Sequence, residues 1–241
     1  MTKRFGFTLA EVLITLGIIG VVAAMTMPTL MNSTQGAQYK AAYKKALSAL
    51  SQAVTLNVAL DDTSFADTIK GVEGSTEAKG AKDDGSADDT KVGTTIASLL
   101  NSRMNVVRAA KKSDVTASGY TLPDEITKVK GCNETGKNPG DEGCTEKTTD
   151  LSPNTYLFFN DGIMFAFDNM SEKCTESNKC VGIVDVNGQK GPNKLTKCDS
   201  GTGTAAKPCV VSNPTDIYHV EFYDQTVLPA DDAAKAVLYG K

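Results

Sequence analysis

The feature that most constrains this chain is a long apolar run close to its N-terminus. After six residues that include two cations (MTKRFG), residues 7–30 read FTLAEVLITLGIIGVVAAMTMPTL and contain one charged side chain, Glu11. About 24 residues at a helical rise of about 1.5 Å would span roughly 36 Å, enough for a hydrocarbon core of about 30 Å. The run therefore predicts a membrane-spanning helix rather than a helix of a soluble core.

The charges beside this run indicate its orientation. Lys3 and Arg4 precede it, and the positive-inside bias keeps such an N-terminus in the cytoplasm and sends the rest of the chain outward. A cleaved secretory signal is the alternative, since it also has a basic start and an apolar stretch. Against it stand the length of the run, the carboxylate near its start, and the weak small-residue cleavage site at residues 22–25.

Glu11 is the informative residue of the apolar run. An ionised carboxylate inside a bilayer costs a few kcal/mol or more and is rarely kept without a partner. A free α-amino group at the same depth would supply that partner, and a cut between Gly6 and Phe7 would create one.

The segment GFTLAEVLI, residues 6–14, closely resembles the processing site of type IV prepilins and type II secretion pseudopilins. The likeness covers about the first 30 residues: a basic leader ending in Gly6, a Phe7 that becomes the first mature residue, and Glu11 at the fifth mature position. It implies that a prepilin peptidase cuts after Gly6 and methylates Phe7, and that Glu11 pairs with a neighbouring subunit's N-terminus. Pro28 falls where many such proteins carry a helix-kinking proline, and proline should bend a helix or interrupt one turn.

The same resemblance implies partners and a location. The partners are the prepilin peptidase and methyltransferase, other pilin or pseudopilin subunits in a homo-oligomeric filament, an assembly platform in the inner membrane, and membrane lipid. The chain would first be a single-pass inner-membrane protein with its N-terminus in the cytoplasm. It would then enter an extracytoplasmic or cell-surface filament.

The rest of the chain predicts an α+β head. Apolar residues at three- and four-residue steps between Tyr39 and Val54 indicate one long helix that leaves the membrane and packs an apolar stripe on a folded head. A second helix is expected at 95–111. Two β-prone runs, 155–160 and 163–167, flank an Asp-Gly turn and predict a hairpin, and 181–186 and 217–223 predict further strands. A helix followed by antiparallel strands is an α+β plan, as in pilin heads.

These elements give a domain plan. Residues 1–6 are the leader, 7–30 the transmembrane and assembly helix, and 31–241 the extracytoplasmic pilin-like head. Within the head, residues 70–93 are poor in apolar side chains and are expected to form a flexible surface loop.

All six cysteines lie in the C-terminal half among polar residues, which favours disulfides in an oxidising compartment. A zinc site is the alternative, but no CxxC pair occurs and the single histidine, His219, lies in a segment of alternating apolar residues away from the cysteines. Six cysteines allow 15 sets of three disulfides, among which we expect the short local pairings. These are Cys132 with Cys144, Cys174 with Cys180, and Cys198 with Cys209.

A polar loop near residue 190 contains hard oxygen ligands of the kind that calcium prefers, on Asp185 and Asn187, with Asp199 after it. It resembles loosely the calcium-binding loops of major pseudopilins. Lys190 and Lys194 oppose a cation, and an Asn-Gly turn between two strands explains the same residues without a metal.

The sequence separates the classes of function. A formal charge of −4 gives no broad basic surface for nucleic acid. No enzyme constellation emerges, since GxSxG, HExxH and phosphate-loop motifs do not occur and His219 fits a partly exposed strand residue. The chain is thus expected to be a structural filament subunit and not an enzyme, with no certain cofactor. The alternatives are a minor subunit at a filament tip, which binds a surface, DNA or a secreted substrate, and a membrane-tethered enzyme.

Overall fold

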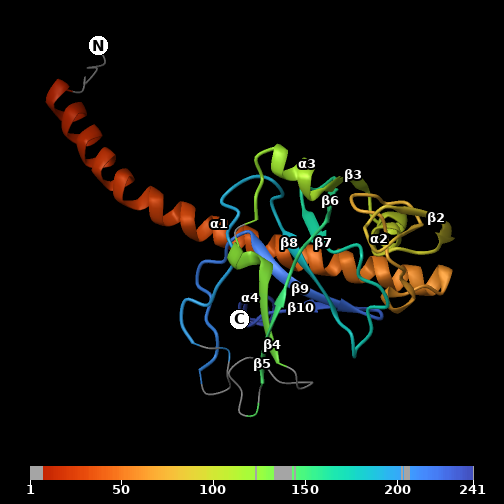
Figure 1. Ribbon diagram of the computed structural model, residues 1–241. Coiled ribbons are helices and arrows are strands. Elements are labelled where there is room, and N and C mark those ends of the chain that lie inside the picture. The colour runs from red at the N-terminus through yellow and green to blue at the C-terminus, as the bar shows by residue number, and fades with distance from the viewer. Residues whose placement is uncertain are drawn as a thin grey trace.

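The computed structural model describes residues 8–122, 124–132, 143, 145–201, 203 and 207–240. One very long helix, α1, is followed by a head in which strands predominate (Figure 1). The elements are, in chain order, α1 (Leu9–Asp61), η1 (Phe65–Asp67), β1 (Lys79–Ala81), β2 (Ala87–Val92), α2 (Ile96–Arg103), β3 (Val106–Lys111), α3 (Lys112–Ala117), η2 (Asp124–Thr127), β4 (Lys128–Cys132), β5 (Glu146–Asp150), β6 (Thr155–Phe159), β7 (Met164–Phe167), β8 (Cys180–Asp185), β9 (Ile217–Tyr223), β10 (Thr226–Pro229) and α4 (Asp232–Tyr239).

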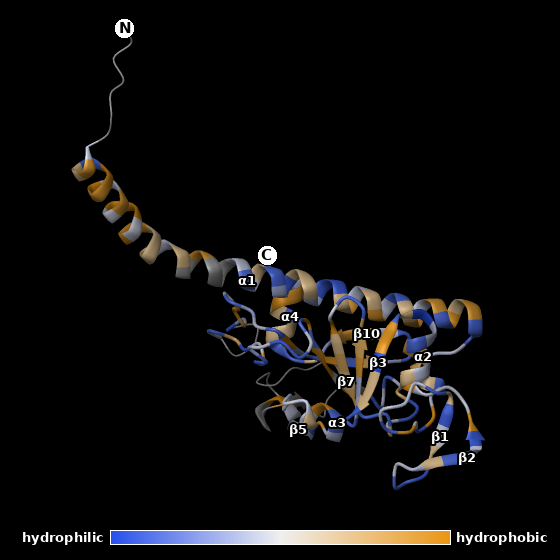
Figure 2. Ribbon diagram, turned by 90° about the horizontal axis from the view of Figure 1, so that it is seen from above, coloured by the Kyte–Doolittle hydropathy of each residue, from blue (hydrophilic) through white to orange (hydrophobic). Residues whose placement is uncertain are grey.

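α1 has two parts in different surroundings. Its outer part, residues 9–27, projects away from the head, and its inner part, residues 36–61, lies along it (Figure 2). The helix runs without interruption through residue 28, and its ribbon curves between the two parts (Figure 1). The kink expected of Pro28 stays a prediction, and the proline, which has no N–H, removes one hydrogen bond from the turn at this position.

The centre of the head is a six-stranded antiparallel sheet in the order β10-β9-β8-β7-β6-β3. The hairpin predicted around Asp161-Gly162 is confirmed as β6 and β7, with Phe158 opposite Met164 and Gly162 at a φ of 86°. Strands β8 and β9 lie where the sequence predicts them. This arrangement is the α+β, pilin-like fold that the sequence indicates.

The inner part of α1 packs on one face of this sheet. Its buried side chains, Tyr43, Leu47, Leu50 and Val54, belong to one core cluster with the aromatic residues of β7 and β9. The Tyr43 ring stacks on Tyr218, with the ring centroids 3.9 Å apart. Burial of such side chains contributes about 1.5–3 kcal/mol each, so this stripe fixes the head on the helix.

The opposite face of the sheet is also covered. A second cluster joins Ala166 and Ile183 of the sheet to Val115 of α3, Ile126 of η2 and Val129 of β4. The sequence analysis foresaw neither this layer nor β10 and α4. In Figure 1, β4 and β5 leave the sheet as an arm. We use "the arm" below for residues 124–132 and 145–151, which comprise η2, β4, β5 and Leu151.

Two segments differ from expectation. The helix expected at 95–111 ends at Arg103, and 106–111 form β3 instead, because Val106 and Val107 are β-branched and the strand pairs with β6. Residues 70–93, expected as a flexible loop, contain the β1–β2 hairpin. Backbone pairing and the ion pairs of Lys70 with Asp83 and Lys79 with Asp89 hold it together, although it buries little apolar surface.

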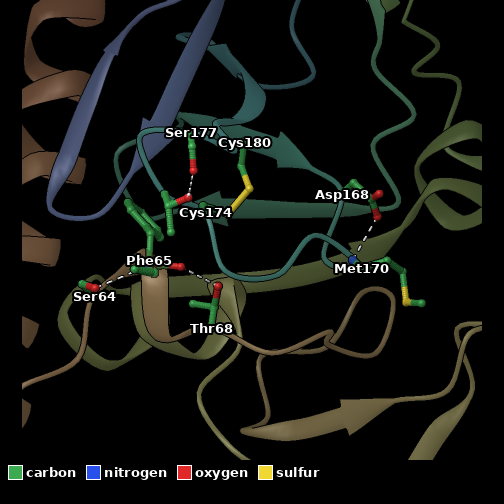
Figure 3. Close-up of a disulfide and its surroundings, with 10 residues drawn as sticks. Ser64, Phe65, Thr68, Asp168, Met170, Cys174, Ser177 and Cys180 are labelled. Carbon is green, nitrogen blue, oxygen red and sulfur yellow. Dashed lines mark hydrogen bonds between the residues drawn. A yellow bond between two sulfur atoms is a disulfide. The ribbon is translucent and has the colours of Figure 1, made fainter.

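Two of the three expected disulfides are confirmed, Cys174–Cys180 and Cys198–Cys209. The pairing of Cys132 with Cys144 lies outside the described residues. Cys174 and Cys180 are buried, and Figure 3 shows their disulfide next to Phe65, whose carbonyl accepts a 3.0 Å hydrogen bond from the Cys174 N–H. The disulfide holds Cys174 at the start of β8, and the hydrogen bond from Cys174 links Phe65 of η1 to the same place.

Candidate functional site

The N-terminus of α1 places Glu11 in a capping box. Thr8 is the N-cap, and its Oγ1 accepts a 3.3 Å hydrogen bond from the Glu11 N–H. In return, Glu11 Oε2 accepts from the Thr8 N–H at 2.8 Å and from the Thr8 hydroxyl at 2.7 Å. Such a box satisfies orphan N–H groups at a helix start. Within the isolated subunit Glu11 thus has polar partners before it meets any neighbour.

The helix surface that follows Glu11 is apolar and lacks contacts within the subunit. Residues Leu9–Met27 have a mean hydropathy of 2.2, and none of this window is buried. The hydroxyls of Thr15 and Thr26 donate to carbonyls of the preceding turn, Thr15 to Glu11 at 2.9 Å and Thr26 to Val22 at 3.0 Å. Polar groups satisfied inside the helix suit a segment surrounded by lipid or by other apolar helices.

The expected processing pair, Gly6 and Phe7, lies outside the described residues. The helix cap begins at Thr8, so a cut between Gly6 and Phe7 leaves the Thr8 N–H and hydroxyl in place for Glu11. Processing and the capping box are therefore compatible.

The residues expected to bind calcium are only partly brought together. Asp185 is buried at the end of β8, where its carboxylate accepts from the Tyr120 hydroxyl at 2.9 Å and the Asn187 N–H at 3.1 Å. Burial, with a contribution from the charge of Asp216, raises the pKa of Asp185 to about 8. The third expected ligand, Asp199, is exposed and accepts from the Ser212 N–H at 2.6 Å.

A residue that the sequence analysis missed, Asp216, is the buried acid near Asp185. Its two oxygens accept from the N–H groups of Asn193 and Lys194 at 2.7 and 2.8 Å. The side-chain oxygens of Asn187 and Asn193 are buried without a hydrogen-bond partner. Oxygen donors thus accumulate in this loop, but the described residues contain no group of three or more His, Cys, Asp or Glu side chains able to hold a metal. The sequence gave no signal for Asp216, because it lies 23 residues from Asn193 and approaches the loop only when β9 pairs with β8.

His219 is buried, not partly exposed as expected. Its Nδ1 lies 2.9 Å from Asp231 Oδ2 and its Nε2 lies 2.6 Å from the Ile126 carbonyl oxygen. In a hydrolase triad the Asp orients a His that takes the proton of the nucleophile, but here the second ring nitrogen of His219 meets a backbone carbonyl. The geometry gives no support to a catalytic role.

The comparison with protein families agrees with the N-terminal geometry. Residues 1–27 match the family described as the prokaryotic N-terminal methylation motif. This motif is the hallmark of the type IV prepilin and pseudopilin family. No curated protein and no solved structure shows significant similarity to the chain. The match ends at residue 27, where the outer part of α1 ends, so the description of the head rests on the structure.

Proposed function

We propose that this protein is a structural subunit of a type IV pilus-like filament or a type II secretion pseudopilus. The observation that carries the proposal is the exposed apolar helix Leu9–Met27, which bears one carboxylate, Glu11, in register with the methylation motif. A surface of this kind is stable in lipid before assembly and against other helices afterwards. Residues 1–6 act as the leader, 7–30 as the membrane and assembly helix, and 31–241 as the extracytoplasmic head.

In the assembled filament, Glu11 pairs with the methylated α-amino group of a neighbour's Phe7. Thr8 occupies Glu11 Oε2, and in the part of the chain that the structure describes Oε1 has no recorded hydrogen-bond partner. Removing one partner from a buried ion pair costs about 3–5 kcal/mol. Subunits therefore favour the axial position in which Glu11 meets the neighbour's amino group, and the pair sets the axial register. The apolar surface of the outer helix supplies most of the association through packing.

The proposal extends to the route of the protein. The prepilin peptidase removes Lys3 and Arg4 with the leader, which takes the formal charge from −4 to −6. Before assembly the protein is a single-pass inner-membrane protein with a cytoplasmic N-terminus. An assembly platform then inserts it among other pilin or pseudopilin subunits.

The test compares Glu11→Ala with Thr15→Ala, an exposed position one turn further along the same helix. Cells expressing each variant are separated into a sheared filament pool and a membrane pool. We expect both variants to be inserted and cleaved, and only Glu11→Ala to be sharply depleted from filaments. Wild-type incorporation of Glu11→Ala would show that Glu11 is not the assembly residue.

N-terminal sequencing of the wild-type filament pool checks the processing site independently, because a start at methylated Phe7 is required. The amount of protein in that pool separates a major structural subunit from a minor tip subunit.

A further inference from the structure

The contacts of His219 link three segments that are far apart in the sequence. The ring is 2 % exposed and stands on β9, on the face of the sheet that the arm covers. On one side it meets Asp231, the N-cap of α4, and on the other the carbonyl of Ile126 in η2. The arm begins at η2, so this contact lies at its root.

Both groups that His219 meets are hydrogen-bond acceptors. A carboxylate and a backbone carbonyl have no proton to give, whereas a neutral imidazole carries one N–H and one lone pair. If the ring is neutral and Asp231 is ionised, only one ring nitrogen carries a proton to donate. At the other nitrogen, the ring lone pair would face a lone pair of the acceptor oxygen. One additional proton on the His219–Asp231 pair removes this conflict, because the ring can then donate to both acceptors.

We propose that His219 is a proton-dependent clasp that holds the arm on the sheet. In the protonated pair, one N–H binds Asp231 Oδ2 and the other binds the Ile126 carbonyl. When the proton leaves, the remaining N–H stays with the carboxylate, since charge-assisted hydrogen bonds are the stronger ones. The Nε2 lone pair then faces the Ile126 carbonyl, and the arm, which begins with η2, separates from the sheet.

The other charged groups near the ring have partners of their own. Glu221, two residues further along β9, forms an ion pair with Lys179 at 3.0 Å. Asp232 and Lys235 of α4 lie 3.8 Å apart. β8 places Ile183 opposite His219.

Asp185 is the remaining titratable group on that face of β8, two residues beyond Ile183, and its carboxylate is bonded to Tyr120. Because burial raises the pKa of Asp185 to about 8, the experiment must separate its titration from that of the clasp.

The experiment measures hydrogen exchange of the full-length protein in detergent, corrected for the intrinsic dependence of exchange on pH, from about pH 5.5 to 8.5, the range around which histidine titrates. An Asp185→Asn background removes the competing carboxyl. We expect protection of the β4 and β5 amides to fall by about tenfold or more as the pH rises, as for the loss of one buried hydrogen bond, while the amides between β7 and β8 keep theirs. Equal protection of the arm across this range would overturn the proposal.

Asp231→Asn is the matched variant. Asparagine is an equally good N-cap, so its Oδ1 can keep the 2.7 Å bond from the Ala234 N–H. Its amide can donate to a neutral His219, which leaves the second ring N–H for Ile126 without an extra proton. The arm should therefore stay protected at every pH in this variant. A pH dependence as steep as in the wild type would contradict the clasp.

A second measurement does not depend on any variant. His219 is the single histidine of the chain, so its ring nitrogens give unambiguous NMR signals. We expect loss of the proton from the His219–Asp231 pair to coincide with loss of arm protection. The proposal would be refuted by a pH at which the NMR signals show that the His219–Asp231 pair has lost its proton while the amides of the arm are still fully protected from exchange.

Discussion

The outer and inner parts of α1 are both rich in apolar side chains, but only the inner part buries them within the subunit. Leu16 of the outer part is 61 % exposed, whereas Leu50 of the inner part is 2 % exposed. The inner stripe is explained by the head on which it packs. The outer surface is explained only by something outside the subunit, either lipid or neighbouring helices. The same residue type in one helix thus serves two different environments.

Replacing one leucine by alanine in each part of α1 should give the largest difference in the free energy of unfolding of the head. Leu50→Ala leaves a cavity in the core cluster and should lower the free energy of unfolding of the head by about 2–5 kcal/mol. Leu16→Ala removes no contact within the head and should change it by less than about 0.5 kcal/mol. Denaturant unfolding of the full-length protein in detergent can be followed by tyrosine fluorescence, because the chain contains seven tyrosines and no tryptophan. Equal losses for the two variants would mean that the outer part also packs on the head.

Substitutions at two glycines should locate the boundary between the outer and inner parts of α1. A Cβ on Gly36 would lie 3.2 Å from Pro214 Cδ, whereas one on Gly20 would meet no atom within 4 Å. Gly36→Leu should therefore force the 213–214 loop off the helix and lower head stability by about 1–3 kcal/mol. Gly20→Leu should leave head stability unchanged. The same unfolding measurement checks both, and a neutral Gly36→Leu would place the first contact of the head further along α1.

The sequence predicted the elements whose signal is local. The membrane helix follows from an apolar run, and the β6–β7 hairpin follows from two β-prone runs around Asp161-Gly162, where positive φ favours glycine. The two confirmed disulfides join cysteines six and eleven residues apart, so proximity in sequence sufficed.

Features that depend on contacts between distant parts of the chain were not predicted from the sequence. The segment around Val106 and Val107 fits a helix by its apolar spacing and becomes a strand because β6 offers a free edge. His219 is buried because the arm folds over one face of the sheet, and the alternation of residues along β9 does not show that this face is covered. Asp216 joins Asp185 only through the register of β8 and β9.

The start of the inner part of α1 lies beside the loop with the oxygen donors. Tyr39 of α1 is close to the Asn187 side chain and within reach of the charges on Asp216 and Asp185, and burial raises the pKa of Tyr39. A cation in this loop would therefore stabilise the region where the inner part begins. A calcium ion held by Asp185, Asn187 and Asp199 stays a prediction, and the structure places Asp216, not Asp199, beside Asp185.

The smallest expected effect is that of calcium on the stability of the head. The folded pKa of Asp185 is raised, so without metal the folded state binds more protons than the unfolded chain and loses stability as the pH rises from about 4 to about 8. Calcium binds the ionised form, so its stabilisation should grow across the same window. At a free calcium concentration of ten to thirty times the Kd, one site should add about 1.4–2 kcal/mol to the free energy of unfolding.

Thermal unfolding with calcium or with a chelator measures this gain at pH 6 and 8. The gain should disappear in Asp185→Asn and persist in Asp199→Asn, whose carboxylate is bonded to Ser212. No gain in the wild-type protein at pH 8 would leave the loop explained as an Asn-Gly turn without a metal.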